Sequence, residues 1–362
     1  MPKNRQIVQV LYSGLGGHAS VAFSLLEGFI KAGYKNSLVF YGIEPLNESY
    51  KHFLKNSSLV QEFYAIKKET KTGLKEWKQF YKYLRTIKPD IILLHSPQLI
   101  LPAYLYSLFN NVKIVTVEHD AISIRTKVKW IITNLNALLA NKLVVLSEPY
   151  KKAVHNKLWY NKSIKKYHII PNGIDVVKYP AKKEYFTGKI IKLFMASRMN
   201  KLRDHKTLIK AVNHLVNKGY NIQLSIAGDG DTLPQLKKEF RYLPYIKFLG
   251  NINEKEIINE LQQTDIYIHS SLAETFSTAI LQAMSTGLPV ITTDIEGTRH
   301  MIRNKQNGLL FKLYDEKDLI NKIETLINNK EQAIRLGKNA RNTVDEKYSI
   351  EKITNLYLKT FE

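Results

Sequence analysis

Two arginines near the middle of the chain are spaced as a phosphate-binding pair would be. Arg198 and Arg203 follow an apolar run that has the length of a buried strand, and Ser197 stands directly before them. Guanidinium groups bind phosphate oxygens through paired hydrogen bonds, so two of them at the end of a strand suit a diphosphate. A solvated loop in which Asp204 caps the next helix is the alternative interpretation.

A carboxylate and an amide flank a second predicted helix start. Glu274 precedes this helix, and Gln282 lies eight residues further along the chain, which is roughly 12 Å along a helix axis. Backbone N–H groups at the start of the helix, around Phe276, Ser277 and Thr278, are suited to phosphate. This spacing would let one side chain reach a sugar and the other a ribose.

A glycine-rich turn follows the first predicted strand. Gly14, Gly16 and Gly17 let the backbone approach a ligand closely, and the helix that follows attracts negative charge at its N-terminus. The spacing differs from the dinucleotide-binding fingerprint, because Ala19 stands at the place of its last glycine. Tyr41, in place of an acidic residue, ends the second predicted strand. The turn therefore disfavours nicotinamide binding, and a plain strand–helix turn remains an alternative.

Short runs rich in isoleucine and valine alternate with longer amphipathic segments along the whole chain. Continuous apolar runs are typical of parallel strands covered on both faces, and their alternation with helices indicates a doubly wound α/β fold. The predicted strands are 7–11, 37–41, 91–95, 113–117, 143–146, 189–195, 223–227, 246–249, 266–269 and 290–292, and the clearest helices are 20–32, 207–218 and 254–263.

This pattern restarts near residue 188, after a turn-rich and charged connector. We therefore expect two Rossmann-like domains, residues 1–180 and 181–345. A final amphipathic segment, 346–362, could cap either domain, and we assign it to the N-terminal one. Ligands of such folds bind at the carboxyl ends of the strands, so two facing domains predict a site in the cleft between them.

The charge balance suggests an anionic partner. The chain has 54 Lys and Arg against 32 Asp and Glu, a net charge of +22. Nucleic acid, a phospholipid surface and a phosphorylated small molecule would each fit this excess, and part of it reflects a general use of lysine at surface positions. The absence of cysteine excludes a disulfide scaffold, a thiolate metal site and a cysteine nucleophile.

One predicted helix combines basic and aromatic residues. Residues 71–85 carry lysines and an arginine at helical spacing with aromatic residues between them, which suits an anionic membrane surface. An ordinary surface helix whose aromatics face the core is the alternative. A second basic stretch, 151–166, also contains aromatic residues.

The uncharged segment 91–112 is interrupted by polar residues and prolines, unlike a membrane span of roughly 20 apolar residues. We expect a cytoplasmic protein that is peripheral on the inner membrane face.

In their order and spacing these motifs resemble a GT-B glycosyltransferase of the retaining family 4 (glycosyl transferases group 1), over essentially the full chain. The segments that carry the resemblance are the glycine turn 14–17, Glu118-His119, the Pro-Asn-Gly-Ile-Asp segment 171–175, Ser197-Arg198 with Arg203, the Ala-Gly-Asp-Gly segment 227–230 and the segment 274–289.

The resemblance implies a hexosyltransferase that uses a nucleotide-sugar, with UDP favoured over GDP, and needs neither a cofactor nor a metal. Its acceptor would be a saccharide or a polyprenyl-diphosphate-linked glycan of a bacterial surface polysaccharide, such as lipopolysaccharide O-antigen or capsule. By position, the catalytic residues would be Arg198, Arg203, Glu274 and His119; the donor would be bound by Gly16, Gly17, Ser197, Phe276, Ser277, Thr278 and Gln282; and the acceptor side would include His18, His95 and Asn172.

Two positions depart from the family pattern. Gln282 stands where the E-x7-E signature ends in a second glutamate, and Arg203 stands where the family has a lysine. A sugar-nucleotide 2-epimerase on the same scaffold and a catalytically degenerate family member are the alternatives.

Asp229-Gly230-Asp231 imitates a D-x-D metal motif, but it follows a strand in a turn that the resemblance itself implies. The ordered motifs also disfavour nucleic acid as the partner.

Overall fold

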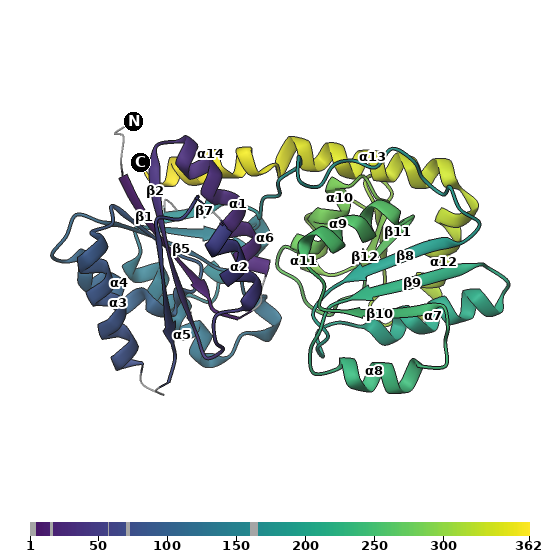
Figure 1. The fold of residues 1–362 in the computed structure, drawn as a ribbon, viewed down its shortest axis with the longest axis horizontal. Helices are drawn as coiled ribbons and strands as arrows, with labels where there is room; N and C mark the ends of the chain where they lie inside the picture. The colour runs from purple at the N-terminus through teal and green to yellow at the C-terminus, as the bar shows by residue number, and fades with distance from the viewer. Residues whose placement is uncertain (1–4, 15–16, 57, 70–72, 160–165) are drawn as a thin grey trace. The chain divides into compact units, whose positions relative to one another are not determined.

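The chain folds into two compact α/β units (Figure 1). The computed structural model describes residues 5–14, 17–56, 58–69, 73–159 and 166–362. The N-terminal unit comprises residues 1–173 together with 350–362, and the C-terminal unit comprises 174–349. The chain thus leaves the first unit at residue 173, earlier than the boundary at 180 that we predicted. A bridge between Ile174 and Ser349 explains this difference, because it joins the start of the connector to the C-terminal unit.

The N-terminal unit is built on a parallel sheet of the strand order β3-β2-β1-β4-β5-β6-β7. Its strands are β1 (Arg5–Tyr12), β2 (Tyr34–Gly42), β3 (Glu62–Lys67), β4 (Ile91–Leu94), β5 (Lys113–Val117), β6 (Lys142–Val145) and β7 (Tyr167–Ile169). Its helices are α1 (Gly17–Lys31), α2 (Glu48–Asn56), α3 (Leu74–Ile87), α4 (Ile100–Ser107), α5 (Lys127–Leu139), α6 (Glu148–His155) and α14 (Ile350–Thr360), with short 3-10 turns η1 (Pro97–Leu99) and η2 (Ile122–Ile124).

The C-terminal unit repeats this plan on a parallel sheet of the order β10-β9-β8-β11-β12-β13. Its strands are β8 (Ile191–Ala196), β9 (Ile222–Ala227), β10 (Ile246–Gly250), β11 (Ile266–His269), β12 (Val290–Thr293) and β13 (Leu309–Phe311). Its helices are α7 (His205–Asn217), α8 (Leu233–Phe240), α9 (Glu254–Gln263), α10 (Thr278–Ser285), α11 (Glu296–Arg299), α12 (Glu316–Asn328) and α13 (Lys330–Lys347).

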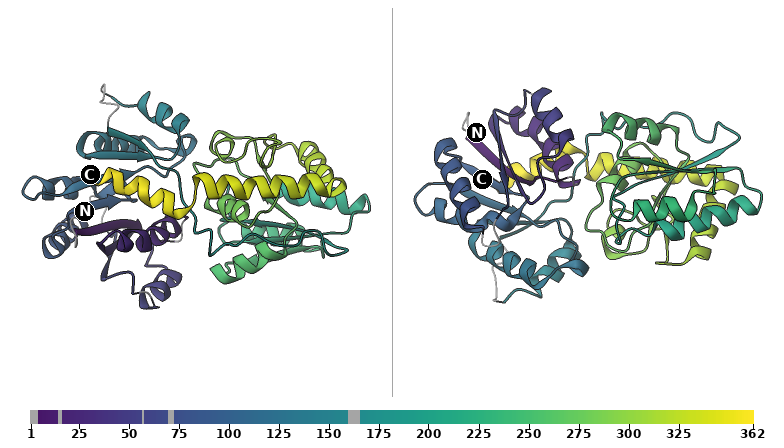
Figure 2. Two further views of the ribbon diagram at one scale, coloured as in Figure 1. Left: turned by 90° about the horizontal axis from the view of Figure 1, so that it is seen from above. Right: turned by 60° about the horizontal axis from the view of Figure 1, so that its bottom comes forward.

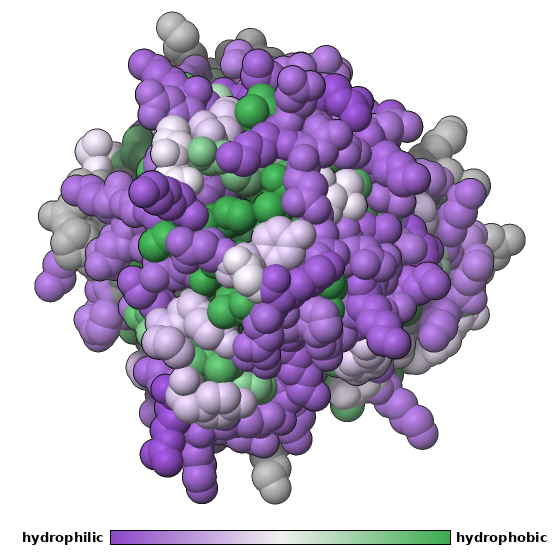
Figure 3. All heavy atoms as spheres, turned by 90° about the vertical axis from the view of Figure 1, so that its right-hand side faces the viewer, coloured by the Kyte–Doolittle hydropathy of each residue, from purple (hydrophilic) through white to green (hydrophobic). Residues whose placement is uncertain are grey.

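Helices lie against both faces of each sheet, as Figures 1 and 2 show. The central strands are accordingly buried along their length: every residue of β4, β11 and β12 is buried. Burial on both faces requires continuous apolar runs, which is why the doubly wound α/β prediction is confirmed. Figure 3 shows a face of the chain on which hydrophilic side chains surround a smaller group of apolar ones.

All ten predicted strands are present, but β3, β7 and β13 were missed. The missed strands lie at the edges of the two sheets. β3 exposes all of its residues except Ile66, and the other two are three residues long. An exposed or very short edge strand lacks the continuous apolar run by which the central strands are recognised.

The basic and aromatic helix α3 packs its apolar face inside the N-terminal unit. Phe80 and Leu84 are fully buried, and Trp77 packs against the same core. Lys75, Lys78, Lys82 and Arg85 are exposed to solvent, and Lys71 lies outside the described residues. This is the pattern of an ordinary surface helix whose aromatic residues face the core, the alternative interpretation of the sequence. Within the described ranges, no helix is long and apolar enough to span a bilayer.

Candidate functional site

The polar residues singled out in the sequence gather where the strand order of each sheet reverses. In the N-terminal unit this point lies between β1 and β4, and in the C-terminal unit it lies between β8 and β11. Loops at the carboxyl ends of such strands diverge and leave room for a ligand. His95 directly follows β4, Ser197 follows β8 and Ser270 follows β11.

In the C-terminal unit, two turns pack closely around Ser197 and Arg198. Gly228 has a φ of +133°, and a Cβ there would lie 1.8 Å from the Ser197 carbonyl oxygen. Only glycine permits both this conformation and this approach. The Arg198 side chain is exposed, while its positive charge helps to lower the pKa of Glu274.

Arg203 and His269 converge on one carboxylate oxygen. Glu274 Oε1 lies 2.9 Å from Arg203 Nη2 and 2.7 Å from His269 Nε2. Arg203 Nη1 also donates to Ser271 Oγ at 2.9 Å and to the Ala273 carbonyl at 3.1 Å. These contacts fix the guanidinium at the end of β11. The sequence had predicted only that it lies near the end of β8.

Glu274 is held in its ionised form. Burial alone would raise the pKa of this carboxyl, but Arg203 and the hydrogen bond with His269 outweigh burial and hold the pKa below its usual range. The side chain is 10% exposed. It can therefore accept hydrogen bonds from a ligand at neutral pH, but it is a poor proton donor.

A second histidine supports the loop after β8. His205, the first residue of α7, is buried, and its Nε2 lies 2.9 Å from Ser197 Oγ. Burial, together with the charges of Arg203 and His269, lowers the pKa of His205 to about 4. His205 is thus a neutral partner of Ser197 at physiological pH. Sequence reasoning missed it because one histidine at a helix start carries no distinctive pattern.

The start of α10 has the form of an anion-binding helix terminus. The Ser277 side chain caps the helix by accepting from the Ile280 N–H at 3.4 Å. Thr278 is the first helical residue, and its N–H has no intrahelical acceptor because it stands in the first turn. Phe276 is buried in an edge-to-face contact with Tyr348, 5.2 Å between ring centroids. The structure thus places the Phe276 side chain in a supporting position at the start of α10.

Gln282 is bound to two residues that the sequence did not single out. Its Nε2 donates to the Tyr179 hydroxyl at 2.8 Å, and that hydroxyl donates to Glu254 Oε1 at 2.9 Å. Tyr179 lies in the connector and Glu254 begins α9, so 103 and 28 residues separate them from Gln282. No sequence pattern links such distant positions.

In the N-terminal unit, His95 and His119 form one pair. Their rings stack 5.4 Å apart, His95 Nδ1 lies 3.1 Å from His119 Nε2, and His95 Nε2 lies 3.3 Å from Gln9 Oε1. A hydrogen bond between two imidazoles requires one of the two to be unprotonated. Desolvation lowers the pKa of His119 to about 4, so His119 is neutral at physiological pH and meets this requirement.

The loop that carries His119 is held by a buried ion pair. Arg125 contacts Glu118, and both side chains are almost fully buried. Arg125 also bonds Thr133 Oγ1 and the Tyr150 hydroxyl, and its guanidinium lies 5.0 Å from the Trp130 ring centroid. Sequence reasoning did not single out Arg125, the ion-pair partner of Glu118.

The remaining predicted residues have different positions. Gly17 begins α1, directly after the glycine turn. Gly16 and the His18 side chain lie outside the described residues. Asn172 is buried just before the chain leaves the N-terminal unit.

The acidic residues of the D-x-D-like segment lie in an exposed turn. Asp229 Oδ1 accepts the Gly230 N–H at 2.7 Å, and Asp231 is exposed beside it. Among the described residues, no three His, Cys, Asp or Glu side chains are grouped so as to hold a metal.

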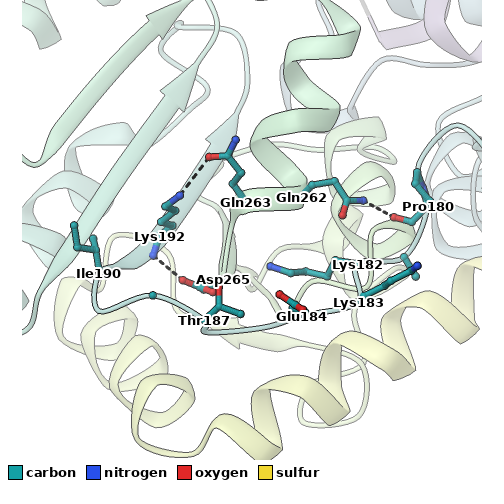
Figure 4. A pocket seen from close by; sticks show the side chains of 12 residues that line it. Pro180, Lys182, Lys183, Glu184, Thr187, Ile190, Lys192, Gln262, Gln263 and Asp265 are labelled. Carbon is teal, nitrogen blue, oxygen red and sulfur yellow. Dashed lines mark hydrogen bonds between the residues drawn. The ribbon is translucent and has the colours of Figure 1, made fainter.

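A pocket of about 590 Å³ lies at the amino ends of the strands of the C-terminal sheet, where β8 begins (Figure 4). Asp265 stands just before β11 and accepts the N–H groups of Phe186 and Lys192, both at 2.9 Å. The other residues that line the pocket come from the connector, the start of β8 and the end of α9. The pocket therefore lies where the connector is attached, away from Arg203 and Glu274.

The comparison with family models decides between the interpretations. A model described as "Glycosyltransferase Family 4" matches residues 15–178, and one described as "Glycosyl transferases group 1" matches residues 179–343. The chain belongs to glycosyltransferase family 4. It is an enzyme of the hexosyltransferase type, as the resemblance implied.

Individual relatives of this family-4 glycosyltransferase cover most of its length. An uncharacterized glycosyltransferase of Methanocaldococcus jannaschii is 28% identical over 311 residues, 80% of this chain and 79% of the relative. An Escherichia coli protein named UDP-Gal:alpha-D-GlcNAc-diphosphoundecaprenol alpha-1,3-galactosyltransferase is 28% identical over 305 residues, 77% of each chain. The solved structure of Anabaena HepE with UDP and glucose superposes with a TM-score of 0.80, 18% identity and 98% coverage of both chains. That similarity confirms the two-domain GT-B fold.

Proposed function

We propose that this family-4 enzyme is a retaining transferase that moves a sugar from UDP to a glycan acceptor carried on a polyprenyl diphosphate, in the synthesis of a bacterial surface polysaccharide. One observation carries the proposal. Arg203 and Glu274 form an ion pair beside the start of α10, at the strand-order reversal of the C-terminal sheet. The name of the E. coli relative supports both UDP and the lipid-linked acceptor.

The cations of this site are suited to the leaving group. As the bond from the sugar to the diphosphate breaks, negative charge grows on the diphosphate oxygens. Arg198, Arg203 and the N–H groups at the start of α10 would stabilise that charge, which is the largest catalytic effect in many enzymes. The new bond forms from the acceptor oxygen on the same face of the sugar, and the acceptor proton passes to the departing phosphate oxygen. No protein base is needed for this step.

Glu274 has a different role, because it is ionised and acts as a hydrogen-bond acceptor. Its Oε1 is engaged by Arg203 and His269, and its position fits the hydroxyl groups of the transferred sugar. The low pKa of this carboxyl argues against general-acid catalysis. The binding of hydroxyl groups by a fixed carboxylate instead determines which sugar is accepted.

We assign the acceptor to the N-terminal unit. His119 is neutral, so it would orient an acceptor hydroxyl by hydrogen bonding rather than supply positive charge. The Glu118–Arg125 ion pair holds the loop that carries His119, and the contact with His95 orients the His119 ring. Such support is what a positioning role requires.

A lipid-linked acceptor would bring the enzyme to a membrane surface, and α5 offers a better contact than α3. Val128, Ile131 and Leu138 are exposed and lie on one face of α5. Trp159 is also exposed, and its backbone N–H donates to Asn134 Oδ1 of α5 at 2.9 Å. A helix with an apolar face and lysines at its start is suited to anionic lipid. We therefore place the peripheral contact on α5.

Sedimentation with vesicles tests this placement. Replacing Val128 and Ile131 by serine should lower the fraction bound to vesicles containing anionic lipid, while replacing Lys75 and Lys78 of α3 by serine should change it much less. Equal effects of the two double variants would contradict the assignment to α5.

Nucleotide binding tests the catalytic proposal. Thermal stabilisation is measured with UDP, GDP, ADP and CMP, because selective binding raises stability by mass action. UDP should give the largest shift, and the matching UDP-sugar should then yield a product with the donor's anomeric configuration when a polyprenyl-diphosphate glycan is added. Conversion of the UDP-sugar without an acceptor would instead indicate an epimerase, and the absence of any shift would indicate a degenerate site.

A further inference from the structure

A chain of two hydrogen bonds joins three separate elements of the C-terminal unit. Gln282 on α10 donates from Nε2 to the Tyr179 hydroxyl at 2.8 Å, and this hydroxyl lies 2.9 Å from Glu254 Oε1 at the start of α9. We call Glu254, Tyr179 and Gln282 the amide relay. None of its three side chains is part of the Arg203–Glu274 group.

The directions of these hydrogen bonds follow from the chemistry of the groups. A carboxylate can only accept, so the single hydroxyl proton of Tyr179 must go to Glu254. The Tyr179 oxygen must then accept its other hydrogen bond, and the NH2 end of the Gln282 amide is the group that can donate it. Exchanging the amide oxygen and nitrogen would place two acceptors against each other. The relay therefore fixes which end of the Gln282 amide faces away from Tyr179.

Several contacts keep the relay in this state. Glu254 is the first residue of α9, where the helix dipole favours a negative charge, and Lys178 Nζ lies 2.5 Å from its Oε2. Tyr179 is 3% exposed, and burial beside Glu254 raises the pKa of its hydroxyl, so it keeps its proton. Its carbonyl accepts from Ser285 Oγ at 2.9 Å and from Arg341 Nη1 at 3.1 Å.

The other end of the amide is left for a ligand. Gln282 is half-buried, and among the described residues none donates a hydrogen bond to its Oε1. Gln282 belongs to α10, whose N-terminal N–H groups would bind the diphosphate under the function proposed above. A fixed acceptor at this place suits the hydroxyl groups of a ribose.

We propose that Glu254 and Tyr179 are positioning residues that lock the Gln282 amide, so that its Oε1 accepts a hydrogen bond from the ribose of the donor nucleotide. The proposal rests on the proposed function, since it needs a nucleotide at α10. It explains how a neutral glutamine can present the same kind of acceptor as a carboxylate, because the relay prevents the amide from turning its NH2 end outward.

An exchange of charge between the two ends of the relay tests the inference. In Gln282→Glu, two carboxylates compete for one hydroxyl proton, so the dissociation constant of UDP should rise at least tenfold. In the double variant Gln282→Glu with Glu254→Gln, the hydroxyl donates to the new carboxylate and accepts from the new amide. UDP binding should then return to within threefold of the wild type. Gln306→Glu, at an exposed position of the same unit, is the control for added charge.

A second variant separates positioning from general damage to the fold. Tyr179→Phe removes the hydroxyl that orients the amide. It should weaken UDP binding and raise the KM for UDP-sugar with little change in kcat, while binding of 2′,3′-dideoxy-UDP, which lacks the ribose hydroxyls, should stay unchanged. This comparison remains decisive even if Gln282→Glu fails to fold.

Different results would contradict the amide relay and the proposed function. If the wild type binds UDP but Gln282→Glu binds it equally well, or the double variant is not rescued, the relay is overturned and the proposed function stands. An equal loss of UDP and dideoxy-UDP binding in Tyr179→Phe would likewise overturn the relay. If the wild type binds none of the nucleotides, both are overturned.

Discussion

At the scale of single residues, the two arginines that the sequence treats alike have different surroundings. Arg203 is held by Glu274, Ser271 and the Ala273 carbonyl. Arg198 is exposed, and its side chain forms no hydrogen bond or ion pair with any residue that the structure describes. Removing Arg203 would therefore disturb the fold as well as the site, whereas Arg198 can be removed to test the site alone.

Arg198→Ala should abolish most activity without weakening the fold. Loss of one donor that stabilises charge in a transition state typically costs about 3 kcal/mol, or 100-fold or more in kcat. An exposed substitution usually changes stability by less than about 0.5 kcal/mol. Turnover of UDP-sugar and urea unfolding measure the two effects. Lys201→Ala, also exposed in the same loop, is the control. Full turnover by Arg198→Ala would contradict a role of Arg198 in stabilising the leaving diphosphate.

His205 makes stability depend on pH. Its pKa is about 4 in the folded chain and about 6.5 in an unfolded one, so the unfolded chain binds more protons between these values. Stability contributed by neutral His205 is therefore complete above pH 6.5 and is lost as the pH falls to 4. At pH 5 the loss is about 2 kcal/mol. Urea unfolding followed by circular dichroism at pH 7.5 and pH 5 should show a smaller difference for His205→Gln than for the wild type.

This pH prediction has an internal comparison. The pKa of His119 is also lowered to about 4, so part of the pH dependence should remain in His205→Gln. An unchanged pH difference in the variant would mean that His205 is already protonated in the folded chain at pH 5.

At the scale of elements, the site depends on close packing between turns. The turn after β9 lies against the turn after β8 because Gly228 has no Cβ. Tyr179 is also held by close packing, because its carbonyl accepts hydrogen bonds from Ser285 of α10 and Arg341 of α13. The residues of the C-terminal site are thus positioned by contacts between loops that follow different strands.

Gly228→Ala should destabilise the C-terminal unit by at least about 3 kcal/mol, because a backbone oxygen cannot move away from the new Cβ and the positive φ adds strain. Gly219→Ala is the matched control. Its φ of +101° is also positive, but no atom lies within 4 Å of the added Cβ, so it should cost only about 1 kcal/mol. Urea unfolding of both variants measures the difference, and equal values would show that φ alone accounts for the cost.

At the scale of the whole molecule, the end of the chain returns to the unit in which it began. α14 packs on α1 of the N-terminal unit, although α13 belongs to the C-terminal unit. Phe361 is buried against Phe29 and Tyr34, and its carbonyl accepts from Lys113 Nζ at 3.1 Å. The last residues therefore complete the core of the first unit.

Phe361→Ala should destabilise the N-terminal unit alone. Truncating a buried phenylalanine costs about 3–5 kcal/mol. The three tryptophans, Trp77, Trp130 and Trp159, all lie in the N-terminal unit, so their fluorescence should report an earlier urea transition. Hydrogen exchange should lose protection in residues 5–173 and stay unchanged in 174–349. Equal loss in both units would contradict the independence of the two cores.

The sequence determined the α/β architecture and the edge of each sheet that carries polar residues. Strands buried on both faces must be continuously apolar, so β4, β8 and β11 were visible as runs. Parallel strands bring their carboxyl ends to one edge, and that rule predicted where Arg198 and Glu274 would lie. The amphipathic period of α3 was equally clear, but its pattern did not tell which partner its apolar face would meet.

Only the tertiary structure decided which of these polar groups touch. Arg203 meets Glu274, and Tyr179 connects Gln282 to Glu254, across long stretches of chain. Local periodicity depends on neighbours a few residues apart, so it carries no information on which loop ends meet. Those contacts are set by how helices and turns pack on the sheet, and they decide that Glu274 is ionised and that Gln282 presents its oxygen.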